Sequence, residues 1–254
     1  MKVLIACEFS GTVRNAFRRR GHDAWSCDLF PADDSSEFHI QGDCREHLAG
    51  WDLIVMHPPC QFLCSSGLHW NKRTPGRSEK TDEALAFVRE LMDAPCKSWA
   101  LENPVGCIGT QIRPYDQLIQ PWMFGHNASK KTCLWLKGLP ALQETKIVPP
   151  QGWSNVTYAM HLGKCELCLE PWCDDCGDHY SECNCVGPQQ DGVLYKKIDG
   201  VQFGCSRKVP PKPVWENQTP SGQNKLGPSK DRWKLRSKTY EGIAEAMAEQ
   251  WGNE

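Results

Sequence analysis

A cysteine that directly follows two prolines is the residue of this sequence best suited to chemistry. Cys60 comes after Pro58 and Pro59, where the short apolar segment 52–56 has ended. The prolines restrict the backbone, so the thiol is held in one direction. A thiolate held in this way can attack one carbon atom of a bound ring. The alternative interpretation is a small buried core residue, which is the usual situation of a free cysteine.

A carboxylate follows a second apolar segment further along the chain. Glu102 comes directly after the segment 99–101 and is followed by Asn103 and Pro104. The carboxyl ends of parallel strands meet at one edge of a sheet, so Glu102 can lie beside Cys60. The two residues are a candidate nucleophile and acid, although Glu102 by itself would be interpreted as a surface carboxylate or a helix cap.

The order and spacing of these motifs resemble those of the DNA cytosine-C5 methyltransferases, most closely the short versions found in phages and prophages. The resemblance covers about residues 1–140 and 217–252. It rests on the motifs Pro59-Cys60-Gln61, Ser65 with Gly67, and Glu102-Asn103, on Phe9-Ser10-Gly11, Asp28 and Gly42-Asp43 upstream of them, and on a last helix at 242–248.

The resemblance implies a role for each catalytic residue. Cys60 would add to C6 of a cytosine that is flipped out of the duplex. Glu102, held by Asn103, would bind the ring at N3 and at its amino group. The segment 124–132 stands where the family carries Gln-x-Arg-x-Arg, and here lysines replace the arginines. Lys131 would neutralise a phosphate or polarise the carbonyl of the base.

The resemblance also implies S-adenosylmethionine as cofactor and double-stranded DNA as partner. Phe9 would lie near the adenine, and Asp28 would bind the ribose hydroxyl groups, as an acid at the end of a second strand does in dinucleotide-binding folds. The family usually has a second glycine in its first turn, which this chain lacks. The cofactor residues implied in this way are Phe9, Ser10, Gly11, Asp28, Asp43, Pro59 and Tyr240.

Alternating strands and helices must position these residues. We expect strands at 2–6, 23–27, 52–56, 98–101 and 132–136, helices at 12–20, 82–93 and 240–250, and polar loops at 68–81 and 217–236. This alternation predicts an α/β fold with a doubly wound, mostly parallel sheet, which the resemblance makes a Rossmann-like methyltransferase fold. Residues 1–140 with 217–254 would form the catalytic domain, and 141–216 a small cysteine-rich insert.

The insert carries a pattern that is typical of structural zinc sites. Two Cys-x-x-Cys pairs are four residues apart, which is too short a gap for an ordinary zinc ribbon. Either two further cysteines complete the site or two ions bind, with His161, His179 and Cys205 nearby. The alternative is a loop with unligated thiols. The candidate ligands are Cys165, Cys168, Cys173, Cys176, Cys183 and Cys185.

Charge and composition favour an intracellular protein with a segment that faces a polyanion, and the resemblance implies the cytoplasm of a bacterium or of a phage-infected cell. The chain of 254 residues has a net charge of −2, but nine basic and two acidic residues lie between 205 and 238. That segment is suited to a polyanion, although it could equally be a solvated tail. With 15 cysteines and no signal-peptide pattern at residues 3–8, a reducing compartment is expected.

Three other functions remain open at this stage. The same scaffold could act on a free pyrimidine nucleotide or use a modified cofactor. An amino-methyltransferase also has a strand followed by Pro-Pro, but with an aromatic residue in the place of Cys60. The third is a zinc-containing DNA-binding protein whose methylase core has decayed, against which the presence of Cys60 and Glu102 argues.

Overall fold

The structure is a computed structural model that describes residues 1–153, 157–161, 205–209, 213–219 and 224–253. It divides into two units, Met1–Pro150 with Trp215–Glu254, and Gln151–Val214. The elements of the larger unit are β1 Lys2–Ala6, α1 Thr12–Arg19, β2 Asp23–Asp28, β3 His39–Gln41, η1 Cys44–His47, β4 Leu53–Met56, α2 Ser65–Leu68, η2 His69–Lys72, α3 Arg77–Met92, β5 Ser98–Pro104, α4 Ile108–Gln111, β6 Gln117–Ile119, η3 Pro121–Met123, β7 Thr132–Lys137, α5 Arg232–Ser237 and α6 Glu241–Gln250.

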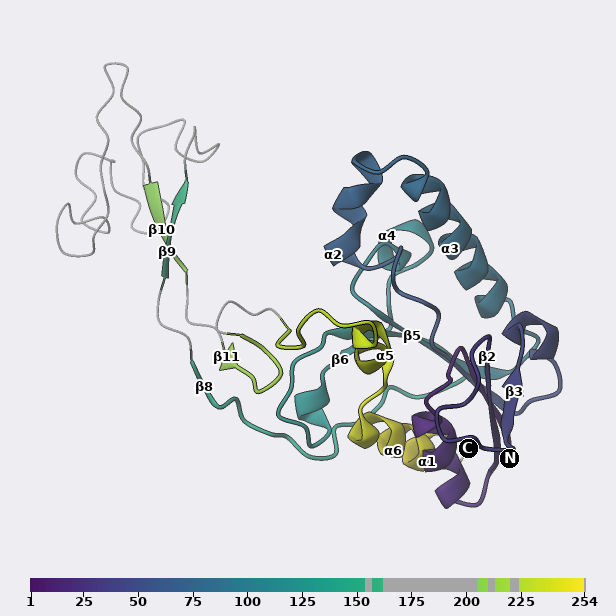
Figure 1. Ribbon diagram of the computed structural model, residues 1–254. Coiled ribbons are helices and arrows are strands. Elements are labelled where there is room, and N and C mark those ends of the chain that lie inside the picture. Colours follow the sequence, from purple (N-terminus) through teal and green to yellow (C-terminus); the bar gives the residue numbers. More distant parts are fainter. Residues whose placement is uncertain (154–156, 162–204, 210–212, 220–223, 254) are drawn as a thin grey trace, which may run out of the picture. The chain divides into compact units, whose positions relative to one another are not determined.

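One seven-stranded sheet organises the larger unit, with the order β3-β2-β1-β4-β5-β7-β6 (Figure 1). Neighbouring strands are parallel from β3 to β5, and only β7 runs antiparallel to its neighbours β5 and β6. Because the chain goes from β1 to β2 on one side and later to β4 on the other, the strand order reverses beside β1. The predicted α/β fold with a doubly wound, mostly parallel sheet is confirmed.

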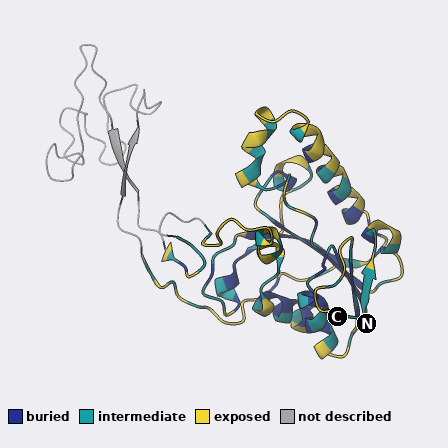
Figure 2. Ribbon diagram, viewed as in Figure 1, coloured by how far each residue is buried: buried dark blue, intermediate teal, exposed yellow. Residues whose placement is uncertain are grey.

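Helices cover both faces of the sheet, which explains why its central strands are apolar throughout. Strands β1 and β4 are buried except at Lys2 (Figure 2). Val3 and Ile5 pack with α1 and α6 in one core, whereas Leu4 and Ala6 pack with α3 in the other. Successive side chains of a strand point to opposite faces, so a strand between two helical layers needs an apolar residue at every position.

The structure contains elements that we did not predict, among them β3, β6, α2 and α4, and it differs from the prediction at the start of α3 and the end of β5. Helix α3 begins at Arg77, inside the segment 68–81 that we predicted as a loop. Its first turn is polar, so no apolar period marks its start, and Thr81 in the second turn donates a hydrogen bond to the carbonyl of Phe62 (3.1 Å). Strand β5 continues to Pro104, three residues beyond the prediction, because β7 pairs with it from Trp99 to Pro104.

The C-terminal segment also contains more regular structure than predicted. Helix α5 lies in residues 217–236, for which we expected an irregular loop or arm, and extends to Ser237. Basic side chains alternate with Trp233 and Leu235 in this helix, so no apolar stripe of helical period marks it in the sequence. The closing helix α6 begins at Glu241, with Tyr240 as its N-cap residue.

The smaller unit, Gln151–Val214, contains two antiparallel strand pairs. Strand β8 (Gly152–Trp153) pairs with β11 (Pro213–Val214), and β9 (Thr157–His161) with β10 (Cys205–Val209). All six cysteines predicted as zinc ligands lie outside the described residues. In the part of the chain that the structure describes, no helix combines the length and apolar character needed to cross a membrane.

Candidate active site

The loop that follows β4 holds Cys60 at the carboxyl edge of the sheet. Pro58 is buried and Cys60 is partly exposed. The carbonyl of Cys60 accepts hydrogen bonds from the backbone N–H groups of Leu63 (3.1 Å) and Cys64 (3.0 Å), so the chain turns back directly after the thiol. A one-turn helix, α2, then starts at Ser65. The thiol therefore lies on a closed turn between two regular elements.

The loop after β5 is fastened to this turn. Asn103, which is 1% exposed, donates a hydrogen bond from Nδ2 to the carbonyl of Pro58 (2.7 Å). The backbone N–H of Ser65 donates to Val105 (3.0 Å), and that of Cys107 to Leu63 (2.9 Å). We expected Asn103 to hold Glu102, but its amide bonds to the Pro-Pro-Cys loop instead. The side chain that orients the cysteine loop thus comes from the neighbouring strand.

Replacing Asn103 with alanine is expected to lower the melting temperature, because the buried carbonyl of Pro58 loses its partner. Such a loss costs about 1–3 kcal/mol, or roughly 2–4 °C for each kcal/mol in a domain of this size. Asn253→Ala is the matched control, since the Asn253 amide makes the same kind of bond to Glu249 (2.8 Å) at the exposed C-terminus. Equal melting temperatures for the two variants would contradict the proposed clamp.

A histidine that sequence reasoning missed contacts the predicted acid. His57 Nδ1 lies 3.3 Å from Glu102 Oε2, and the two side chains are 10% and 13% exposed. Burial of Glu102 opposes its charge, but the hydrogen bond from His57 and the charge of Lys130 outweigh burial and lower the pKa of this carboxyl. His57 Nε2 is buried with no hydrogen-bond partner among the described residues. Its position directly after β4 was the available sequence signal.

The thiol of Cys60 is paired with a second thiol one turn later. The hydrogen bond with Cys64, then burial and the nearby charges of Cys64 and Glu102, raise the pKa of Cys60, while Lys130 opposes them. The same bond, together with the Ser66 hydroxyl at 3.3 Å and the N–H of Gly67, lowers the pKa of Cys64. One negative charge on this pair is therefore favoured at Cys64, and Cys60 holds the proton.

Two adjacent lysines have different positions at this site. The charge of Lys130 lowers the pKa of both Cys60 and Glu102. Lys131, the lysine selected from the sequence, is exposed and borders a cleft of about 480 Å³. The other lining residues of this cleft are Cys64, Ser65, Ser66, Pro104, Val105, Tyr115 and Leu118. The cleft thus opens beside the thiol pair and offers both polar and apolar surface.

The predicted cofactor loop follows β1 and is shaped by an internal carboxylate. Glu8 is 5% exposed and accepts hydrogen bonds from Val13 N (2.7 Å) and Arg14 N (3.1 Å), so it caps the first turn of α1. Gly11 has φ +71°, and a Cβ there would collide with the Arg14 guanidinium. Ser10 Oγ donates to Glu8 (3.2 Å). Only glycine fits at position 11, because its backbone is left-handed and the Arg14 guanidinium occupies the place of a Cβ.

The two predicted cofactor acids lie near each other at the same sheet edge. Both Asp28 and Asp43 contribute to raising the pKa of the Cys27 thiol, after burial as the main cause. Asp28 ends β2 and accepts the N–H of Phe30 (3.0 Å), and burial raises its pKa. Asp43 caps η1 and forms an ion pair with Arg45 (2.6 Å). Asp28 therefore keeps oxygen capacity for a ligand, whereas Arg45 engages both oxygens of Asp43.

The remaining predicted cofactor residues lie elsewhere. Pro59 is exposed and borders a shallow groove against α3 that includes Phe62 and Phe87. The hydroxyl of Tyr240 accepts a hydrogen bond from Asn217 Nδ2 (3.4 Å), and its ring lies 5.1 Å from that of His126. The structure thus brings Phe9, Ser10, Gly11 and Asp28 to the ends of β1 and β2, and gives Pro59 and Tyr240 other neighbours.

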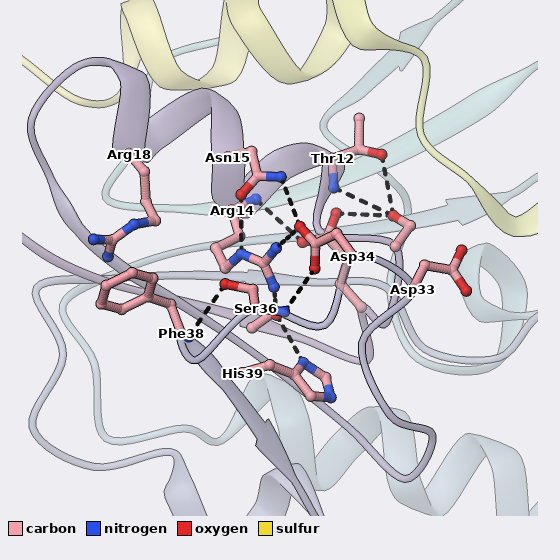
Figure 3. Close-up of polar contacts among 12 residues, drawn as sticks. Thr12, Arg14, Asn15, Arg18, Asp33, Asp34, Ser36, Phe38 and His39 are labelled. Carbon is pink, nitrogen blue, oxygen red and sulfur yellow. Dashed lines mark hydrogen bonds and ion pairs between the residues drawn. The ribbon is translucent and has the colours of Figure 1, made fainter.

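A buried arginine fixes the loop between β2 and β3 (Figure 3). Arg14 has no exposed surface, and its guanidinium donates to Ser26 Oγ (2.8 Å) and pairs with Asp34. Ser26 Oγ lies 2.8 Å from His39 Nδ1, and His39 Nε2 lies 2.9 Å from the carbonyl of Phe30. These contacts require Ser26 to donate to Nδ1 and Nε2–H to donate to Phe30. The network therefore sets the position of Phe30.

The chain was compared with protein families, curated proteins and solved structures. No family model and no curated protein matches it. One similar solved structure is that of a protein encoded within an E. coli prophage and provisionally described as a DNA modification methyltransferase. The two chains are 16% identical with a TM-score of 0.39, over 65% of this chain and 61% of that one. The chain thus spans less than two thirds of that protein, and a likeness at this level does not bear on activity.

Proposed function

We propose that the protein is a DNA cytosine-5 methyltransferase. The observation that carries the proposal is the juxtaposition of the Cys60 thiol with the His57–Glu102 pair at the ends of β4 and β5. A thiol and a hydrogen-bonded carboxylate at one sheet edge can address two atoms of the same pyrimidine ring. Cys60 follows β4, the strand next to β1, where the strand order reverses and ligands bind in such sheets, and Glu102 lies in the adjacent strand β5.

The first step requires a thiolate at Cys60, and Cys64 is the group placed to accept its proton. Transfer of the Cys60 proton to the Cys64 thiolate leaves Cys60 charged for attack. A bond then forms between Cys60 Sγ and C6 of cytosine, and the ring electrons make C5 nucleophilic. After C5 has accepted a methyl group, loss of its proton to a base breaks the bond to Sγ and frees the thiolate.

Glu102 and His57 stabilise the ring while it is bonded to Cys60. Attack at C6 places negative charge toward N3, where a proton is needed. His57 Nδ1–H donates to Glu102 Oε2, and Thr132 is a second side-chain partner of Glu102. A carboxylate can accept about four hydrogen bonds, so Glu102 can also bind N3–H or the amino group. The low pKa of Glu102 means that the carboxylate is charged at neutral pH. A proton for N3 must be an additional one, bound at Glu102 or at the second ring nitrogen of His57, because neutral His57 cannot give up its Nδ1–H.

S-adenosylmethionine supplies the methyl group when it is bound. The ends of β1 and β2 suit such a cofactor in two respects. Phe9 offers an aromatic ring. Asp28 keeps carboxylate oxygen for hydroxyl groups. We infer that these residues bind the adenosyl part and orient it toward the cleft at β4.

Double-stranded DNA is the partner that the charge distribution favours. The segment that leads into α5 and the helix itself expose Lys225, Lys230 and Arg236. Contacts of this kind with phosphate groups are independent of sequence and weaken as salt is added. A base must leave the duplex to reach Cys60 and Glu102, which are partly buried at the sheet edge.

Mass spectrometry of the DNA product tests the proposed function. Mixed-sequence duplex DNA is incubated with the protein and methyl-deuterated S-adenosylmethionine, and the nucleosides are then analysed. Labelled 5-methyldeoxycytidine is the expected product. Label on an exocyclic amine would favour the amino-methyltransferase, and label found only when free pyrimidine nucleotides are added would favour the nucleotide enzyme. Bound DNA without any label would favour a non-catalytic DNA-binding protein.

Zinc in the smaller unit remains part of the proposal. Among the described residues, no group of three or more side chains is arranged to hold a metal, and the six predicted ligands lie outside that part. The support is limited to the Cys-x-x-Cys pattern and to the strands that flank it, where Cys205 of β10 pairs directly with His161 of β9. Metal analysis of the purified protein should give at least one zinc per chain, and its absence would remove zinc from the proposal.

A further inference from the structure

Helix α5 covers the aromatic residue of the proposed cofactor loop. The Trp233 ring centroid lies 5.7 Å from that of Phe9 and 5.2 Å from that of Phe30. Lys234 Nζ lies 5.9 Å from the centre of the Phe9 ring. As a result, Phe9 is only 7% exposed although it lies in a loop. Three aromatic rings from three separate segments thus meet at the carboxyl ends of β1 and β2.

This trio is not packed like a core cluster. Phe30 is 48% and Trp233 46% exposed. The rings of Phe9 and Trp233 are inclined at 54°, and those of Phe30 and Trp233 at 44°, so no two of these faces lie flat on each other. Half-exposed aromatic faces beside a carboxylate are typical of a pocket for a flat, partly polar ring. Asp28 provides the carboxylate, because its Oδ1 accepts the N–H of Phe30.

The outer side of the same helix is basic, and few contacts hold it. Lys230 and Arg236 are exposed, and Lys238 pairs with Asp33 (2.8 Å) in the loop that also carries Phe30. Lys130 Nζ donates a hydrogen bond to the carbonyl of Arg236 (3.2 Å). The charge of Lys130 also acts on Cys60 and Glu102. The inner side of α5 therefore contacts the cofactor loop, and its basic side faces solvent. The helix is also linked to Cys60 and Glu102, because Lys130 bonds to its backbone and acts on both groups by its charge.

We propose that Trp233 and Phe30 form the outer wall of the adenine pocket and that cofactor and DNA bind cooperatively. The two sites are coupled because α5, which carries Trp233, belongs to the segment that contacts DNA phosphate groups. The inference rests on the proposed function and adds to it two binding residues and a coupling between its two ligands. The purine ring lies between Phe9 and Trp233. Basic side chains on the outer side hold α5 against the duplex and thereby keep the wall closed.

The dimensions require only a small movement of α5. A flat ring between two aromatic faces needs about 3.5–4.0 Å on each side, so the two faces must be about 7–8 Å apart. The centroids of Phe9 and Trp233 are now 5.7 Å apart. Trp233 must therefore move outward by roughly 1–2 Å and become parallel to Phe9. The contacts of α5 with Asp33 and Lys130 involve flexible lysine side chains, which can follow such a shift. Phe30 stays in place because the Arg14–Ser26–His39 network holds its backbone.

Calorimetric binding of S-adenosylhomocysteine to the full chain tests the pocket wall. Trp233→Ala should weaken binding on the order of 10- to 100-fold, the range expected for loss of one base-stacking aromatic. Trp233→Phe should stay within several-fold of the wild type. Methylthioadenosine, which lacks the amino-acid part, should show the same factor, because the lost contact is with the purine. Trp70→Ala is the matched control, since Trp70 is 47% exposed and contacts neither Phe9 nor Phe30 in the described structure.

The coupling is tested by repeating the titration with mixed-sequence duplex DNA at low salt. DNA should tighten S-adenosylhomocysteine binding about 5-fold or more, and Arg236→Gln with Lys230→Gln should abolish this gain. Lys137→Gln, at the opposite end of β7, is the control. Unchanged or tighter binding by Trp233→Ala, or no effect of DNA, would overturn the inference alone. A wild-type protein that binds no S-adenosylhomocysteine would remove the proposed function and the inference together.

Discussion

Cys60→Ala is expected to abolish both methylation of DNA and covalent attachment to DNA that contains 5-fluorocytosine. Fluorine at C5 leaves no proton to remove, so the bond between Sγ and C6 persists and the complex survives a denaturing gel. Without the thiol this bond cannot form, and the turnover rate should fall by ~10⁴ or more, as it does when the nucleophile of an enzyme is deleted. The measurement is the shifted band together with the rate of methyl incorporation.

Cys64→Ser is the informative companion variant. It keeps a polar side chain one turn after Cys60 but removes the thiolate proposed as proton acceptor. Attachment should then still occur, more slowly and with a stronger dependence on high pH, because Cys60 must lose its proton to solvent. If the Cys60→Ala protein becomes attached to DNA through Cys64, then Cys64 is the nucleophile and Cys60 is the proton acceptor. Full activity of Cys60→Ala would contradict the mechanism. A loss of activity supports the mechanism only if the melting temperature of the variant matches that of the wild type.

The sequence allowed us to predict the residues at the strand ends because those signals are local. A continuous apolar run marks each central strand, and the residue that follows it lies at the carboxyl edge. Phe9, Asp28, Cys60 and Glu102 could all be placed in this way before the sheet order was known. The resemblance added the interpretation of these residues, and the parallel sheet itself followed from the alternation of elements.

Contacts between loops could not be predicted from local signals. Asn103 was expected to hold Glu102, but the pairing of β5 with β7 sets its direction, and its amide reaches Pro58. His57 precedes the prolines and gives no periodic signal, although it contacts Glu102 across two strands. Which of Lys130 and Lys131 lies near Cys60 and Glu102 depends on the direction in which each side chain leaves the backbone just before β7, and no local signal gives that direction. We did not predict helix α5 because Trp233 packs on the loop residues Phe9 and Phe30 and not on the sheet, so the helix has no apolar stripe.

Glu102→Gln is expected to lower the turnover rate by ~10²–10⁴, the usual contribution of a positioned acid or base. The amide still donates and accepts hydrogen bonds, so DNA affinity should change little, but the melting temperature at neutral pH should fall because the interactions that favour the charged carboxylate are lost. The carboxyl has a lowered pKa in the folded protein. Its contribution to stability is therefore complete above the unfolded value and is lost only as the pH falls through the folded pKa. At low pH, Glu102→Gln should lose less stability than the wild type.

His57→Asn distinguishes orientation from proton supply at the same pair. The asparagine amide can donate to Glu102 in the place of Nδ1–H, but it cannot carry a proton to the ring. Turnover should fall at neutral pH and recover in part as the pH is lowered, because Glu102 must then bind the proton itself. His57→Ala, which loses both functions, should also lose orientation and raise KM.

The double variant Glu102→Gln/His57→Asn completes the cycle. If the two residues act as one proton-holding unit, the double variant is no slower than the slower single variant, because the second change removes nothing that is still working. Losses that multiply would mean that His57 and Glu102 contribute independently, and His57 would then be a structural neighbour of the catalytic carboxylate. A pH profile of His57→Asn identical in shape to that of the wild type would lead to the same conclusion.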